Sequence, residues 1–160
     1  MTRYSDRLGR LAVRQLRGLG VRTWRRSRTG AEGALSARER KRRMTAAEPF
    51  AWRLDTAAAI ASLGRPLAWT ELSDPAMSST RTVEARPDLW GDVVLARRDT
   101  PTIYHLSVVA DDALQGVTLV VRGLDLFPAT GIHRLLQTQL DLPEPTYFHH
   151  RLIMGPDGRK

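Results

Sequence analysis

Two residues in the second half of the chain have side chains suited to an acidic ligand. Arg122, followed by Gly123, lies near the end of the apolar run from Gly116 to Leu126, and Tyr104 lies in the preceding run from Thr102 to Asp112. A guanidinium group binds a carboxylate or phosphate through two parallel hydrogen bonds, and a phenol adds a third contact. The pair indicates a pocket for an acidic small molecule, although an exposed charge at a strand end and a tyrosine within a sheet would give the same pattern.

Other motifs point less clearly to chemistry. Asp111 and Asp112 could act as paired carboxylates in acid-base catalysis or in magnesium binding, but an Asp-Asp pair that enters a turn is more typical of a cap or an Asx turn. A phosphate-binding GxxxxGK[ST] loop is absent, and Gly18-Leu19-Gly20 is too short for a dinucleotide fingerprint. The residues alone therefore indicate no nucleotide site.

The four histidines do not predict a metal site. His149 and His150 are adjacent in the predicted strand from Tyr147 to Met154, so their side chains point to opposite faces and cannot chelate one ion. His105 and His133 have no ligand partners at a suitable spacing.

These candidate residues require a sheet to position them. Apolar runs of the VVLA and LVV type, alternating with a helix, are typical of an α/β fold in which helices cover a parallel sheet. Open sheets of this kind bind ligands at the carboxyl ends of their strands. We expect a helix from Thr130 that ends before Pro143, and three strands in the runs Gly91 to Arg98, Thr102 to Asp112 and Gly116 to Leu126.

Further elements are predicted upstream. Ser36 and Glu39 form a capping box that begins a short basic helix through about Met44. The alternation from Phe50 to Asp55 predicts a half-buried strand, and the segment from Asp74 to Thr82 predicts a surface connection.

Charge is concentrated in the N-terminal third of the chain. The first 45 of 160 residues hold fourteen basic and three acidic side chains, which gives +11, whereas the remaining residues have a net charge of −3. Five arginines recur at helical spacing on one face of the first twenty residues: Arg3, Arg7, Arg10, Arg14 and Arg17. This amphipathic segment could contact RNA or an anionic membrane, resemble a transit peptide, or present a solvated face.

Composition excludes several classes of protein. The chain has no cysteine, which excludes disulfides and a cysteine-based zinc site. No apolar run approaches the roughly 20 residues that cross a bilayer, so we expect one soluble domain or a piece of one.

Three segments in order resemble the class I glutamyl-tRNA synthetase superfamily: RRDTPTIYHLSVVADD, GVTLVVRGLDLFPAT and LPEPTYFHHRLIMGPDGRK. Within it, GDVVLARRDTPTIYHLSVVADDALQG is most similar to the glutamyl-queuosine tRNA(Asp) synthetase branch. The resemblance covers residues 35–160 and is dense from Gly91. It implies the second half of a Rossmann-like catalytic core that activates glutamate with ATP and transfers it to the queuosine base of a tRNA. Tyr104 and Arg122 match the family's glutamate-binding pair.

The chain departs from this family at several positions. It holds no His-Ile-Gly-His-type motif, which binds ATP in the family, and Lys160 stands just before the place of the KMSKS-type lysine. The zinc-binding cysteines have no counterpart, and Gly123-Leu124-Asp125 replaces the family's Gly-Glu-Asp. We therefore expect this chain alone to be catalytically silent, because without bound ATP it lacks the positioning that lowers such barriers by about 7 to 11 kcal/mol.

The resemblance implies a partial ligase with ATP as cofactor and with tRNA and glutamate as partners, monomeric, cytoplasmic and without a membrane partner. We expect residues 1–34 to form a basic helix and loop outside the family match, and residues 35–160 to form a partial catalytic domain. No catalytic residue is assigned. The alternatives are a non-catalytic RNA-binding module in which Arg10 and Arg14 contact phosphates, and an inactive remnant with no stable fold.

Overall fold

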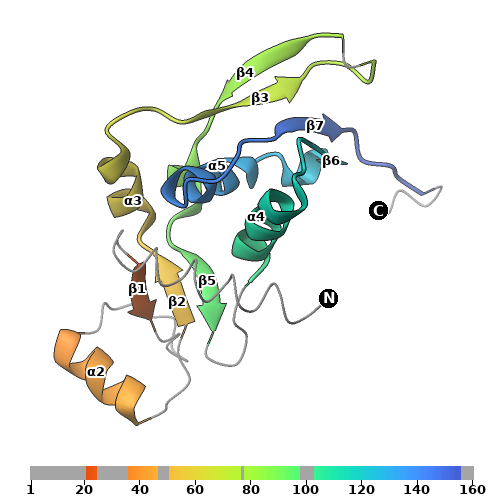
Figure 1. The fold of residues 1–160 in the computed structure, drawn as a ribbon. Coiled ribbons are helices and arrows are strands. Elements are labelled where there is room, and N and C mark those ends of the chain that lie inside the picture. The colour runs from red at the N-terminus through yellow and green to blue at the C-terminus, as the bar shows by residue number, and fades with distance from the viewer. Residues whose placement is uncertain (1–20, 25–35, 47–50, 77, 98–102, 156–160) are drawn as a thin grey trace.

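The computed structural model describes residues 21–24, 36–46, 51–76, 78–97 and 103–155. These residues form two sheets, with helices between and beside them (Figure 1). The strands are β1 (Val21–Trp24), β2 (Ala51–Leu54), β3 (Ala68–Leu72), β4 (Thr80–Glu84), β5 (Val93–Arg97), β6 (Leu119–Gly123) and β7 (Thr146–His150). The helices are α2 (Ala37–Thr45), α3 (Thr56–Leu63), α4 (Tyr104–Gln115) and α5 (Thr130–Gln139), with short 3-10 turns η2 (Pro87–Trp90) and η3 (Leu124–Leu126).

The four-stranded sheet has the order β4-β3-β7-β6. β3, β7 and β6 run parallel, and β4 pairs antiparallel with β3. In the β3 to β4 connection, the Asp74 carboxylate accepts hydrogen bonds from the hydroxyls of Ser78 and Ser79. The parallel strands confirm the α/β class with a parallel sheet that the sequence predicts.

Helix α5 lies at the centre of the molecule, between the two sheets (Figure 1). Nine of its ten residues are buried, and Ile132, Leu135 and Leu136 join the main hydrophobic core. Its buried polar side chains have partners, as burial requires. The Gln139 amide, for example, donates to the Ala59 carbonyl and to the Ser62 hydroxyl.

The three-stranded sheet has the antiparallel order β1-β2-β5. From β2 the chain enters α3 through Asp55, whose carboxylate accepts from the Ala58 N–H as an N-cap. Gly64 ends the helix at a φ of 62°, a left-handed conformation that favours glycine. This Asp-to-Gly pattern is a helix signal that the sequence prediction did not use, and β1 and β3 were not predicted either. The surface connection predicted from Asp74 to Thr82 is wrong for its last three residues, which begin β4.

Most of the predicted elements are present. The strand predicted from Gly91 to Arg98 is β5, and the helix predicted from Thr130 is α5. The N-cap half of the predicted capping box is present, since the Glu39 N–H donates to the Ser36 hydroxyl at 3.2 Å at the start of α2, while the Glu39 carboxylate pairs with Arg42. The strands predicted near residues 50–55 and 147–154 are the shorter β2 and β7.

The strand predicted from Thr102 to Asp112 is wrong, because the structure forms helix α4 there. Neighbouring β-branched residues, Val108 and Val109, favoured a strand on propensity. The helical signals were the spacing of the buried residues Leu106 and Val109 and the left-handed C-cap at Gly116. Asp111 and Asp112 consequently lie within a helix rather than in a turn.

Strand β6 is less buried than its sequence predicts. It is the last strand in the order of the described sheet, and Val121 is 57% exposed. Its remaining residues are half-buried, so the expectation of burial on both faces is wrong for this strand. Among the described helices, none has the length and the apolar composition that crossing a membrane requires.

Candidate carboxylate-binding site

The site begins with the register of two parallel strands. Arg122 on β6 pairs with His149 on β7, so the two side chains lie side by side at the carboxyl end of the sheet. Helix α5 starts after the short turn that follows β6, and it places Thr130 and His133 one turn apart, on the same face. Residues of β7 and α5 therefore lie around the guanidinium group that β6 carries.

The Arg122 guanidinium is held by three neutral acceptors. Its Nε donates to His149 Nε2 at 3.0 Å, and its Nη2 donates to the Thr130 hydroxyl at 2.7 Å. Its Nη1 lies 3.1 Å from His133 Nδ1. The guanidinium carbon also lies 5.3 Å from the centre of the Tyr147 ring, within range of a cation–π contact.

These contacts determine the protonation of the histidines. Arginine has only donors, so each imidazole nitrogen that faces Arg122 must present a lone pair. His149 is then neutral and carries its proton on Nδ1, 3.0 Å from both carboxylate oxygens of Glu71. His133 carries its proton on Nε2, which lies 3.1 Å from His105 Nδ1.

Glu71, at the centre of the sheet on β3, forms the end of this hydrogen-bonded chain. It is only 2% exposed, and besides the His149 ring it accepts from the His149 backbone N–H and from Trp69 Nε1, each at 2.9 Å. A buried carboxylate requires such donors. The imidazole of His149 thus separates Glu71 from Arg122.

Helix α4 supplies the other side of the site. Its first two side chains are Tyr104 and His105, whose rings lie 5.8 Å and 5.3 Å from the ring of His133. The Trp90 ring packs edge-on against His105 at 5.5 Å. Tyr104 is 46% exposed, so its ring lies where the buried cluster opens to solvent.

Burial and the charge of Arg122 keep the histidines neutral. Burial, and then the nearby guanidinium charge, lowers the pKa of His133 to about 3. The same two causes lower the pKa of His105. Burial also lowers the pKa of His149, although its contact with Glu71 opposes that shift.

No carboxylate among the described residues forms an ion pair with Arg122. Asp112 on α4 is close enough for the guanidinium charge to lower its pKa, but burial has the larger effect and raises it. The positive charge of Arg122 is therefore not directly neutralised by another side chain in the described part of the protein.

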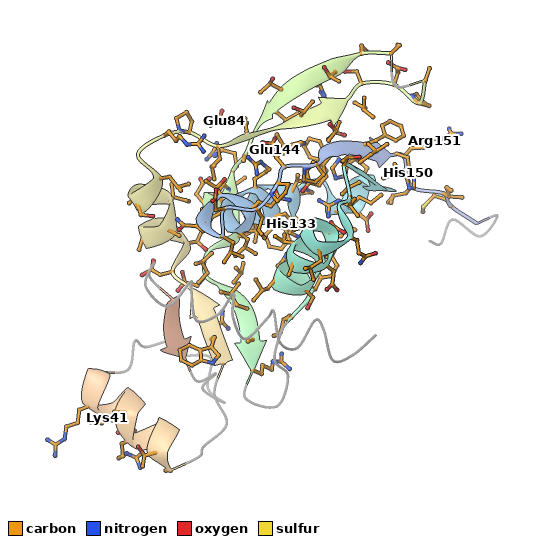
Figure 2. The ribbon with its side chains drawn as sticks, in the orientation of Figure 1. Lys41, Glu84, His133, Glu144, His150 and Arg151 are labelled. Carbon is orange, nitrogen blue, oxygen red and sulfur yellow. The ribbon has the colours of Figure 1, made fainter. Side chains whose placement is uncertain are left out.

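The predicted site residues have different outcomes. Tyr104 and Arg122 both lie next to His133, which is labelled in Figure 2. Their role in binding glutamate stays a prediction. Arg10, Arg14 and Lys160 lie outside the described residues. In the ranges that the structure describes, no three histidine, aspartate or glutamate side chains form a group that could hold a metal.

Sequence reasoning missed four residues of the cluster: Glu71, Thr130, His133 and His149. It considered the histidines only as metal ligands. Strand alternation puts Tyr147 and His149 on the same face of β7, and this could have predicted that His149 is buried. The spacing of Thr130 and His133 could have placed both on one face of α5.

Comparisons with known proteins bear on this arrangement. The family described as tRNA synthetases class I (E and Q), catalytic domain, matches residues 69–160. A glutamyl-Q tRNA(Asp) synthetase of Rhodobacter capsulatus is 58% identical over 81 residues, which cover 48% of this chain and 29% of that protein. One from Pseudomonas syringae pv. tomato is 54% identical over 70 residues, which cover 44% of this chain and 24% of the relative.

Solved structures show the same fold. The crystal structure of a glutamate-tRNA synthetase from Elizabethkingia anophelis aligns with a TM-score of 0.57 at 24% identity, covering 79% of this chain and 23% of that one. The chain thus spans less than a third of the length of the relatives it matches. By the family match over more than half of its residues, it belongs to the class I tRNA synthetases (E and Q), within their catalytic domain.

Proposed function

We propose that Arg122 and Tyr104 bind a carboxylate of glutamate, and that the chain is part of a ligase that activates glutamate with ATP and transfers it to tRNA. The relatives named as glutamyl-Q tRNA(Asp) synthetases support the queuosine base of tRNA(Asp) as the acceptor. None of the described residues is assigned to ATP, and the catalytic silence of the chain on its own stays a prediction.

The observation that carries this proposal is the set of donors left on Arg122. A guanidinium has five N–H groups. Three of them are directed at His149, His133 and Thr130. The remaining two, one on each terminal nitrogen, match the two oxygens of a carboxylate.

Charge favours the same ligand. The three acceptors on Arg122 are neutral, so an incoming carboxylate meets a positive charge that no side chain pairs with directly, in a half-buried site where attraction is stronger than in water. Glutamine keeps the α-carboxylate and has an amide in place of the γ-carboxylate, so weaker binding of glutamine would identify the γ-carboxylate as the group at Arg122.

Titration of the full 160-residue chain with glutamate, followed by heteronuclear NMR, tests the proposal. We expect Arg122→Ala to weaken binding about 10-fold to 100-fold, because hydrogen bonds to charged groups contribute about 1.5 to 3 kcal/mol. Tyr104→Phe should weaken it by about threefold to tenfold, the equivalent of one neutral hydrogen bond.

Arg81→Ala is the matched control, because Arg81 is an exposed arginine on β4, outside the cluster. It should bind glutamate like the unmodified chain. Equal affinity of the Arg122→Ala and Arg81→Ala variants would show that glutamate does not bind at Arg122.

A further inference from the structure

The chain of hydrogen bonds through Arg122 has a direction. The Arg122 guanidinium can only donate, and on one side it donates to His149, whose opposite nitrogen faces the Glu71 carboxylate. On the other side it faces His133, whose opposite nitrogen faces His105. Each imidazole must therefore be neutral, with its proton on the nitrogen that points away from Arg122.

The two histidines use different ring nitrogens for this contact. His149 presents Nε2 to Arg122 and keeps its proton on Nδ1, whereas His133 presents Nδ1 and keeps its proton on Nε2. The carboxylate of Glu71 specifies the Nδ1–H tautomer of His149, because a carboxylate has only acceptors and therefore needs an N–H donor at Nδ1. Tautomers are set by hydrogen-bond partners in this way.

We infer that His149 and His133 are positioning residues for Arg122, each acting through a lone pair in one fixed tautomer, with Glu71 fixing that of His149. This inference rests on the proposed function in one respect, the identity of the ligand as glutamate. Its physical consequence is that the guanidinium is oriented without being neutralised, so that two N–H groups and the full charge remain for the ligand.

Histidine tautomers are observable directly, without any ligand. In nitrogen-15 and carbon-13 side-chain spectra of the unmodified chain at pH 7, we expect the Nδ1–H form for His149 and the Nε2–H form for His133. A cationic ring at either position, or the opposite tautomer at either, overturns the inference. This readout needs no substitution, so it stands even where a variant fails to fold.

Amide substitutions separate the two ring nitrogens. An asparagine oxygen reaches roughly the place of Nδ1, and a glutamine oxygen reaches roughly the place of Nε2. His133→Asn and His149→Gln can therefore keep an acceptor for Arg122, whereas His133→Gln and His149→Asn remove it.

We expect the first two variants to bind glutamate within about threefold of the unmodified chain and the other two about tenfold more weakly, the equivalent of one hydrogen bond. His150→Asn and His150→Gln are controls, because His150 follows His149 on the opposite face of β7, and both should bind normally. Equal loss for Asn and Gln at both positions, or the reverse order, overturns the inference. An unmodified chain that binds no glutamate instead overturns the proposed function, and the tautomer spectra then decide the inference.

Discussion

At the scale of single residues, Arg134 and Arg122 are a buried and a half-buried arginine with opposite environments. Arg134 on α5 is paired at 2.7 Å with Glu144 and donates to Gln137 and to the Ala68 carbonyl, so its charge is compensated within the fold. Arg122 has only neutral acceptors. Removal of a partner from a buried ion pair leaves an unpaired charge, so Arg134 has a structural role, whereas the binding of a ligand by Arg122 stays a prediction.

The histidines around Arg122 should make stability depend on pH. Burial lowers the pKa of His133 from 6.5 to about 3, in a site that it shares with Arg122 of β6, Tyr104 and His105 of α4 and His149 of β7. Between these two values the unfolded chain binds a proton that the folded chain does not, so stability falls as the pH decreases from 6.5 toward 3. Through His133 alone, the free energy of unfolding falls by up to about 1.4 kcal/mol for each pH unit in this range.

Urea unfolding at pH 7.5, 6.5 and 5.0 measures this contribution. His133→Asn removes the titrating group while it keeps an acceptor for Arg122. Between pH 6.5 and 5.0 it should lose up to about 2 kcal/mol less stability than the unmodified chain. The same pH dependence in both proteins would mean that His133 does not titrate as its burial indicates.

At the scale of elements, α5 connects the site to the core. Its polar residues Thr130 and His133 face Arg122, while Leu135 and Leu136 are fully buried in the hydrophobic core. A helix that is buried all round depends on packing rather than on propensity for its stability. The orientation of the site is therefore coupled to the packing of this helix.

A matched pair of leucine substitutions tests the role of α5. Leu136→Ala should reduce the free energy of unfolding by about 2 to 5 kcal/mol, because it leaves a cavity in the core. Leu114→Ala, on α4, should change it by about 0.5 kcal/mol or less, since this side chain is 51% exposed. Chemical denaturation gives both values, and a similar loss in both variants would contradict the central position of α5.

At the scale of the whole molecule, charge and site lie in different parts of the chain. The first 45 residues have a net charge of +11, and the rest, which includes the candidate carboxylate-binding site, has −3. Lys41 on α2 extends away from the rest of the chain in Figure 2. RNA contact by the N-terminal third, independent of glutamate binding, stays a prediction.

The salt dependence of tRNA binding tests that role. If Arg10 and Arg14 each neutralise one phosphate, their replacement by alanine should reduce the slope of log affinity against log salt by about 1.4 to 1.8. Glutamate binding should be unchanged in this double variant. An unaltered slope in filter-binding or anisotropy titrations would exclude phosphate contacts by these two arginines.

Local sequence signals gave a large part of the fold. The apolar runs that form β5 and β6, the capping residue of α2 and the apolar face of α5 are signals that act within a few residues. Helix α4 was mistaken for a strand because Val108 and Val109 favour strands on propensity, whereas its burial at Leu106 and Val109 follows a helical spacing. Tertiary packing decided between these two patterns.

By itself, the sequence determined the family resemblance, the α/β class, the position of Arg122 at a strand end and the separation of basic charge from the body of the chain. Only the tertiary structure decided how Arg122 is held. Glu71, His133 and His149 lie on three different elements, and the hydrogen bonds that order them form between residues up to 78 positions apart. No local periodicity encodes such distances, because strand order and helix packing alone bring these side chains together.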